Sequence, residues 1–332
     1  MTRLFAAAAL LALAPLVCAQ AAYSSRPEVR AFIADLVQRH GFVESELNRL
    51  FSRVRRMEPV LQAIQPPTAE RPRSWEEYRA QFVNERRILA GAAFWRANRK
   101  ALERAQREYG VPAQYIAAII GVETFYGRNT GRWRVVDALT TLAFDYPPRA
   151  DFFRDELVNY LLLARDTGID VFSVRGSYAG AIGIPQFMPG SVRRYAVDFD
   201  GNGVVDLRNS ATDAIGSVAN FLKEHGWQSE GEVAFEARAR GDAYRVYLDG
   251  GVEPKHPISE LVRAGVEPLR VPEHLMAARA ALVELQTPGR PSELRLGLQN
   301  FYVLTRYNRS ALYAAAVADL GKELRKTQEP GR

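Results

Sequence analysis

Apolar residues at helical spacing dominate the first third of the chain. Val29, Phe32, Ile33, Leu36 and Val37 form one stripe that stops at His40-Gly41, which predicts an amphipathic helix. Prolines at 66, 67 and 72 then mark a loop. A serine follows at position 74, and serine is a preferred helix N-cap residue, so a further helix should begin there. We expect residues 22–108 to form an N-terminal helical region.

The segment after residue 108 is almost continuously apolar and predicts a buried helix. Pro112 stands near its start, where a helix tolerates proline. Ile116, Ile119 and Glu123 recur at positions i, i+3 and i+7, so the Glu123 carboxyl shares a face with isoleucines. Burial disfavours the charged carboxylate and raises its pKa, as a general acid near neutral pH requires. Glu123 is therefore the predicted catalytic acid.

The alternative for Glu123 is an acidic residue that turns to solvent at the end of an apolar helix, which is common because buried glutamate is rare. Gly121 and Gly127 stand on either side of it. Glycine inside a helix is less favourable than alanine by about 1 kcal/mol, so its presence indicates a close backbone approach or a cleft. The glycines favour the functional interpretation.

The pattern changes after residue 228. Aromatic and β-branched residues near Gly250-Gly251 indicate short strands and turns, so residues 229–270 are predicted to be a small β-rich insert. Leu275–Leu285 is interpreted as helical or mixed, and Ser310–Leu324 as a closing helix within a C-terminal region of residues 271–332. With a motif-dense core at residues 109–228, the predicted fold class is α+β, mainly α.

The N-terminus has the pattern of a secretory signal. Arg3 precedes an apolar run, and small residues follow up to Ala21, which predicts a signal peptide over residues 1–21 and a periplasmic protein. Pro15-Leu16-Val17 before Cys18 does not match a lipoprotein signal. No later segment approaches about 18 uninterrupted apolar residues, so we expect a mature chain that does not span a membrane.

Composition and charge restrict the partner. The 332 residues are 47% hydrophobic and 25% charged, an ordinary globular balance. A net charge of +6 suits an anionic partner. Basic and acidic residues alternate without a basic, aromatic strand, so we expect no nucleic acid. A cell-wall polymer with carboxylates fits better, and a surface that is basic without a partner is the alternative.

The segment 176–189 is rich in glycine and alanine and carries Ser177, Tyr178, Gln186 and Phe187. Small residues let a ligand approach the backbone, while hydroxyl, amide and ring groups can bond to and stack on sugars. We predict a sugar-binding segment, with a tight helix-packing loop as the alternative. The Gly-x-Ser-x-Gly turn of serine hydrolases is absent, so a nucleophilic serine is disfavoured.

Residues 198–209 have the spacing of a calcium-binding EF-hand loop. Oxygen-bearing side chains stand at loop positions one, three, five and nine, with glycine at six. Position twelve is Asn209 instead of the usual glutamate, so a later carboxylate such as Asp213 would have to close the site. A structural calcium ion is predicted, and an Asp/Gly turn without metal is the alternative. The four histidines show no zinc spacing.

The segment 300–310 offers Tyr302, Arg306, Tyr307 and Asn308 just before the last predicted helix. Aromatic rings beside amides are typical of a sugar subsite, which is one interpretation of this segment. A strand that packs its rings in the core is an equal alternative.

Six motifs in order along the chain resemble the lytic murein transglycosylases of the B family. They are Gly121-Val-Glu-Thr, Phe144-Asp-Tyr-Pro, Ser177-Tyr-Ala-Gly-Ala, Gln186-Phe-Met-Pro, Asp213-Ala-Ile-Gly-Ser-Val-Ala-Asn220 and Asn300-Phe-Tyr-Val-Leu-Thr-Arg-Tyr-Asn308. The resemblance implies a lysozyme-like core with helical N- and C-terminal parts. It also implies action on peptidoglycan, calcium in the EF-hand-like loop and no organic cofactor. Proteins of cell-wall synthesis or remodelling are further candidate partners.

The resemblance also implies roles for individual residues. The family's acid/base falls on Glu123, supported by Ser177 and Gln186. Its glycan groove falls on Tyr78, Arg149, Tyr302 and Tyr307, with Pro148 where relatives carry a second arginine. The implied calcium ligands are Asp198, Asp200, Asn202, the carbonyl of Val204, and Asp213.

The family's reaction cleaves the bond from N-acetylmuramic acid to N-acetylglucosamine and leaves a 1,6-anhydro sugar. The rivals are a lysozyme-type hydrolase, which needs a second carboxylate such as Asp137 or Asp145, and a catalytically silent wall-binding protein.

Overall fold

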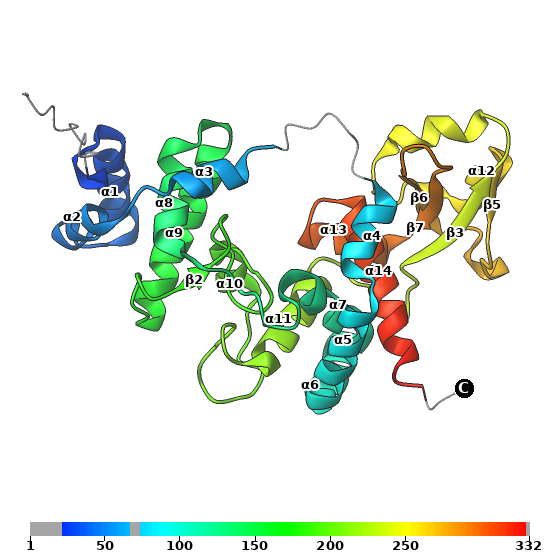
Figure 1. The fold of residues 1–332 in the computed structure, drawn as a ribbon, viewed down its shortest axis with the longest axis horizontal. Coiled ribbons are helices and arrows are strands. Elements are labelled where there is room, and N and C mark those ends of the chain that lie inside the picture. Colours follow the sequence, from blue (N-terminus) through cyan, green and yellow to red (C-terminus); the bar gives the residue numbers. More distant parts are fainter. Residues whose placement is uncertain (1–21, 67–73, 330–332) are drawn as a thin grey trace, which may run out of the picture. The chain divides into compact units, whose positions relative to one another are not determined.

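The structure, a computed structural model, describes residues 22–66 and 74–329 (Figure 1). They form two compact units that divide after Arg55. The first unit contains the 3-10 helix η1 (Tyr23–Ser25) and helices α1 (Pro27–His40) and α2 (Glu44–Arg53). The predicted signal peptide, with Cys18, lies outside the described residues.

The first unit is built on the predicted apolar stripe. Val29, Ile33 and Leu36 of α1 are buried, as is Phe51 of α2, because the two helices pack their apolar faces together. Helix α1 ends at Gly41, which adopts a left-handed φ of 68° that favours glycine. The predicted helix and its stop are confirmed.

The second unit is mainly helical. Its α-helices are α3 (Glu58–Ile64), α4 (Trp75–Phe82), α5 (Glu85–Ala97), α6 (Arg99–Tyr109), α7 (Ala113–Thr124), α8 (Val135–Asp145), α9 (Ala150–Thr167), α10 (Pro189–Tyr195), α11 (Ala211–Glu224), α12 (Ile258–Arg263), α13 (Gln299–Tyr307) and α14 (Ala311–Lys326). Its 3-10 helices are η2 (Pro147–Arg149), η3 (Ala243–Gly250) and η4 (Glu273–Leu275). Its strands are β1 (Trp133–Arg134), β2 (Arg175–Gly176), β3 (Ala234–Ala239), β4 (His256–Pro257), β5 (Val266–Pro268), β6 (Arg279–Leu285) and β7 (Glu293–Gly297).

Helix α7 lies at the centre of the second unit and contacts α5, α6, α11 and α14. Ile116, Ile119 and Ile120 are fully buried there. Each such side chain contributes about 1.5–3 kcal/mol by leaving water. The alanine-rich helix α14 packs closely on α7, and at Gly321 an added Cβ would lie 3.0 Å from the Tyr115 ring. The predicted buried helix is confirmed.

Two serines begin helices where the sequence predicts them. Ser74 Oγ accepts a hydrogen bond from the Glu77 amide (3.5 Å) at the start of α4, and Ser310 Oγ accepts one from the Tyr313 amide (3.3 Å) at the start of α14. These bonds satisfy amides that have no partner inside the helix. Helix α14 therefore begins at a defined residue, which fixes the position of Tyr313 along its axis.

The β-rich part is a five-stranded antiparallel sheet in the order β4-β6-β7-β3-β5. It reaches Gly297, beyond the predicted insert end at residue 270. The helical or mixed interpretation of Leu275–Leu285 is wrong, because most of that segment is strand β6, whose Leu282 pairs with Leu296. Apart from Arg279 and Glu284 the segment is apolar, so it shows no clear helical or strand period, and pairing with β7, the next strand along the chain, decides its structure.

The strand alternative for segment 300–310 is also wrong, since residues up to Tyr307 form helix α13. Among the described helices, none has the length and apolar character needed to cross a membrane.

Candidate active site and acidic loop

Glu123 occupies the last turn of α7, and its side chain is partly exposed. The Tyr313 hydroxyl, from α14, donates a hydrogen bond to Glu123 Oε1 (2.7 Å). Burial raises the pKa of Glu123 from 4.5 to about 7, while the bond from Tyr313 acts in the opposite direction. A carboxyl group with this pKa exchanges a proton near neutral pH.

Tyr313 stands in a pair with Tyr307. Their rings are nearly parallel, with an interplanar angle of 12° and centroids 6.3 Å apart. The Tyr307 hydroxyl donates to the carbonyl of Pro185 (2.6 Å). Burial, and then the charge of Glu123, raise the pKa of both tyrosines well above the ordinary value. Both hydroxyls therefore remain neutral donors when Glu123 ionises.

Sequence reasoning missed Tyr313. The signal was a single tyrosine in the alanine-rich run of the last helix, six residues after Tyr307. A helix with mostly small side chains packs closely against its neighbours. The one large polar side chain in it must therefore fit into a neighbouring element. Tyr313 is 2% exposed and bonds to Glu123 from a distant part of the chain.

The glycine before Glu123 makes room for an aromatic ring. A Cβ added at Gly121 would lie 2.6 Å from the Tyr126 ring, and one at Gly91 of α5 would also collide with it. Tyr126 is thus inserted between α5 and α7. The predicted close approach at Gly121 is confirmed, and the approaching group is a side chain.

The segment 177–188 is attached to the end of α7. Thr124 Oγ1 donates to the carbonyl of Ile184 (2.8 Å), and the Gln186 side-chain amide donates to the carbonyls of Thr130 (3.1 Å) and Gly183 (2.8 Å). Gln186 has a left-handed φ of 54°, which costs about 1–3 kcal/mol in a non-glycine residue. With both amide protons engaged, Gln186 Oε1 is the group left to accept.

Ser177, another predicted site residue of this segment, shapes the loop through its hydroxyl group. Ser177 Oγ accepts a hydrogen bond from the Ala181 amide (3.0 Å). Because the hydroxyl acts there as an acceptor, its own proton can be donated elsewhere. Ser177 is partly exposed, and the neighbouring Tyr178 is 40% exposed.

Phe187 does not fit its predicted role as a sugar contact. It is 2% exposed, and its ring packs against Phe221 (5.5 Å between centroids) and Tyr307 (5.8 Å). The apolar ring is more favourable in the core than on a sugar face. Phe187 therefore packs beside the Tyr307 ring and helps to hold it in place.

The remaining predicted groove residues are partly or fully exposed. Tyr78 of α4 packs on Phe82 (5.0 Å between centroids) and interacts electrostatically with Tyr313. Arg149 lies over Phe152 (4.4 Å) at the start of α9. Tyr302 is partly exposed on α13, and Asn308 is exposed just after it.

The two carboxylates considered for a hydrolytic mechanism are engaged with arginines. Asp137 is 2% exposed and accepts from Arg134 Nε (2.6 Å). Asp145 lies 3.7 Å from Arg56. Among the described residues, burial and Tyr313 set the pKa of Glu123, and no carboxylate contributes to it.

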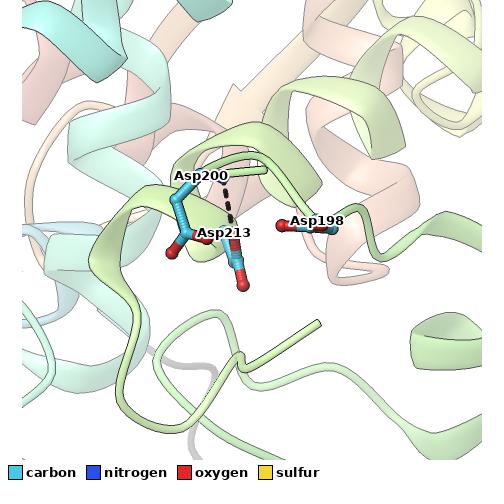
Figure 2. Close-up of side chains that lie close together, drawn as sticks. All are labelled: Asp198, Asp200 and Asp213. Carbon is cyan, nitrogen blue, oxygen red and sulfur yellow. Dashed lines mark hydrogen bonds between the residues drawn. The ribbon is translucent and has the colours of Figure 1, made fainter. Parts of the chain in front are cut away.

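The EF-hand-like loop gathers three carboxylates, which Figure 2 shows side by side. Asp198, Asp200 and Asp213 each place one oxygen within 4.8 Å of the others. Asp213, in the first turn of α11, is fully buried. Its Oδ1 accepts hydrogen bonds from the backbone amides of Phe199 (2.8 Å) and Asp200 (3.1 Å). These bonds attach the loop to α11.

Backbone amides organise the rest of the loop. Asp198 accepts hydrogen bonds from the amides of Gly203 (2.7 Å) and Gly201 (2.8 Å), which lower its pKa. Asn202 Oδ1 accepts from the amide of Val204 (2.8 Å). Asp206, at loop position nine, instead accepts from the side chain of Asn209 (2.8 Å) and lies outside the three-carboxylate group.

Glu123 lines neither of two cavities found in the described part of the second unit. One of about 230 Å³ is mainly apolar and lies between α9, α10 and residues 205–208. The other, of about 440 Å³, is polar and lies beside Arg79, Arg295 and Asp319. Cavity size alone therefore does not locate the candidate active site.

Comparison with known proteins places most of the chain, residues 24–322, in one family. A family model described as "Transglycosylase SLT domain" matches residues 24–322. The membrane-bound lytic murein transglycosylase B of Escherichia coli K12 is 40% identical over 309 residues, which cover 90% of this chain and 83% of that protein.

Two solved structures extend this comparison. The soluble lytic transglycosylase SltB1 of Pseudomonas aeruginosa matches with a TM-score of 0.85 and 46% identity, covering 92% of this chain and all of that one. The Escherichia coli lytic transglycosylase Slt35 in complex with calcium matches with a TM-score of 0.81 and 40% identity, covering 90% and 93%. These matches confirm the predicted mainly helical fold.

Proposed function

This chain belongs to the family of the transglycosylase SLT domain, the lytic transglycosylases, and we propose that it cleaves peptidoglycan strands between N-acetylmuramic acid and N-acetylglucosamine. Glu123 is the proposed general acid and base. The observation that carries this proposal is the partly buried Glu123 carboxyl group, which has a pKa of about 7 and accepts a hydrogen bond from Tyr313. A pKa near the working pH lets one group both give and take a proton.

In the proposed reaction, protonated Glu123 donates its proton to the glycosidic oxygen as the bond from that oxygen to muramyl C1 breaks. The resulting Glu123 carboxylate then accepts the proton of the muramyl C6 hydroxyl, whose oxygen bonds to C1. The product is a 1,6-anhydro sugar, and no water is consumed. Glu123 ends protonated, as it began.

A single carboxyl group is sufficient if the substrate stabilises its own positive charge. The N-acetyl group of muramic acid can take the place of the second carboxylate, as it does in substrate-assisted glycosidases. Ser177 is the proposed donor that orients this group, because its hydroxyl proton is free of the Ala181 bond. Gln186 is proposed to accept from the sugar through Oε1.

Tyr78, Tyr178, Tyr302 and Tyr307 are proposed to line the glycan groove together with Arg149 and Asn308. Of these, Tyr307 acts through Tyr313 and the carbonyl of Pro185, since its hydroxyl is already engaged. The exposed ring of Tyr178 is suited to stack on a sugar face.

Calcium is the proposed occupant of the acidic loop. Hard oxygen donors in a flexible loop suit this ion, and the three gathered carboxylates of Asp198, Asp200 and Asp213 fit it. Asn202 and the carbonyl of Val204 would complete the set. The calcium would hold the loop to α11, and the proposed reaction needs no organic cofactor.

The proposed substrate also defines where the protein acts. Peptidoglycan lies outside the cytoplasmic membrane, so we propose a periplasmic protein whose N-terminal residues direct its export. Proteins that synthesise or remodel the wall are its proposed neighbours.

The test is the mass of the products released from purified peptidoglycan. We expect muropeptides with a 1,6-anhydro end, each lighter by one water than the hydrolytic product. Products with a free reducing end would instead support a hydrolase, and release of no product would support a wall-binding protein. The Glu123→Gln variant, incubated in parallel, should release none.

A further inference from the structure

Three arginines surround the ring of Phe125, two residues after Glu123. Arg86 and Arg87 come from α5, and Arg128 follows α7. Their guanidinium carbons lie 5.1, 5.0 and 5.1 Å from the ring centroid. This distance is within the range of a cation–π contact, which stabilises each cation by interaction with the ring face. We call these four residues the Phe125 cluster.

The positive charges of the Phe125 cluster are not neutralised by the protein. No ion pair among the described residues involves any of its three arginines. Arg87 donates to the carbonyls of Gly121 and Gln81, and its buried Nε has no hydrogen-bond partner. By contrast, buried Arg295 pairs with Asp319 (2.9 Å) and Glu293. Burial, and less strongly the charge of Arg86, lower the pKa of Arg87.

The backbone holds the Phe125 ring in place at an energetic cost. Phe125 and Tyr126 have left-handed φ values of 51° and 60°. Such a conformation costs a non-glycine residue about 1–3 kcal/mol and is often found at functional sites. A glycine at position 125 would relieve this strain but would remove the ring on which the arginines stack.

The cluster borders the candidate active site. Arg87 also contacts the ring of Phe82 (5.1 Å), which packs on Tyr78. Through Gly121, Arg87 holds the turn of α7 that carries Glu123. Arg86 and Arg128 are exposed, so their guanidinium groups are available to a ligand.

We propose that the Phe125 cluster binds a carboxylate of the stem peptide attached to the muramyl residue. This inference rests on the proposed function, because the sugars of a peptidoglycan strand are neutral and its peptides carry the carboxylates. A planar guanidinium group matches a carboxylate with two parallel hydrogen bonds. Arg86 and Arg128 make these bonds, while Arg87 holds the ring and the helix.

The test compares the Arg86→Ala/Arg128→Ala variant with an Arg99→Ala/Lys100→Ala control, which removes the same charge from exposed positions on α6. On strands that carry stem peptides, the cluster variant should raise KM roughly tenfold or more, as expected for a lost charge-assisted contact. On the same strands with their carboxylates amidated, its KM should equal that of the unmutated protein. An equal rise on both substrates, or none on either, overturns the proposal.

A second measurement uses the unmutated chain and does not depend on how the variant folds. A disaccharide peptide with free carboxylates should bind about ten times more tightly than the same peptide with its carboxylates amidated. Equal affinities overturn the proposal. If the protein binds both peptides with this difference but releases no anhydro product, the proposed reaction fails while the carboxylate site stands.

Discussion

The molecule places carboxylates in two opposite environments. Glu123 lies beside Tyr307 and accepts a hydrogen bond from the Tyr313 hydroxyl, and burial raises its pKa to about 7. Asp198 lies in a loop whose backbone amides point at it, and the bond from Gly203 contributes most to lowering its pKa. One group holds a proton near neutrality, and the other is a permanent anion.

The difference shows that burial, together with the number and kind of hydrogen-bond donors, decides the role of a carboxyl group. Several amide donors stabilise the charged form, which suits a cation ligand. A single neutral donor in apolar surroundings leaves the charged form poorly solvated, which suits an acid. Each region should therefore respond to a different perturbation.

Glu123→Gln should produce the largest effect, a loss of roughly 10³-fold or more in kcat, because the amide cannot transfer a proton. Folding and glycan binding should stay nearly intact. Rates of muropeptide release and the affinity of the inactive protein for strands check this. Asp145→Asn is the control, and a comparable loss in that variant would favour a two-carboxylate hydrolase.

Tyr313→Phe removes the hydroxyl that donates a hydrogen bond to Glu123. We expect kcat to fall about 10- to 100-fold, because a hydrogen bond to a charged group contributes about 1.5–3 kcal/mol. The bond stabilises the carboxylate, so its loss should also move the pKa of Glu123 upward. A pH–rate profile measures both effects, and a basic limb that stays in place or moves down contradicts this role.

Removal of calcium tests the other environment. Chelation should lower the melting temperature, since an ion that binds only the native state adds about 2.7 kcal/mol when it is present at about 100 times its Kd. Asp213→Asn should abolish the response to added calcium. If neither the chelator nor added calcium changes the melting temperature, the proposal of a calcium site is wrong.

Gly121→Ala tests whether the Tyr126 ring needs the space beside Glu123. The added methyl would lie 2.6 Å from that ring. The overpacking destabilises the protein, while alanine is more favourable than glycine in a helix. The net expectation is a loss of about 1–2 kcal/mol in the free energy of unfolding. In a Tyr126→Ala background the same change should be neutral or stabilising. Denaturant unfolding of the four proteins measures this coupling, and equal losses in both backgrounds would contradict it.

Local patterns allowed much of this architecture to be predicted. The face shared by Ile116 and Glu123, the serine caps of α4 and α14, and the gathering of Asp198 with Asp213 all depend on short-range spacing. Such spacing is set by helix and turn geometry, which the sequence expresses directly.

The parts that could not be predicted depend on contacts between distant residues. Tyr313 reaches Glu123 across 190 positions, and the sheet extends beyond residue 270 because Phe235 of β3 pairs with Leu296 of β7. Phe187 has the residue type of a sugar contact, but packing against Phe221 and Tyr307 buries it. The spacing of residues along the sequence does not show which side chains from other elements will pack on the Phe187 ring.

The most direct test of the account is the pKa of Glu123 itself. Carbon-13 NMR of glutamate-labelled protein would follow its carboxyl signal with pH, assigned by its absence from the Glu123→Gln variant. We predict a midpoint of about 7, so that the acid is protonated below this pH and the rate falls as pH rises through it. A midpoint near the ordinary 4.5 would show a carboxylate already ionised at neutral pH and would contradict the account.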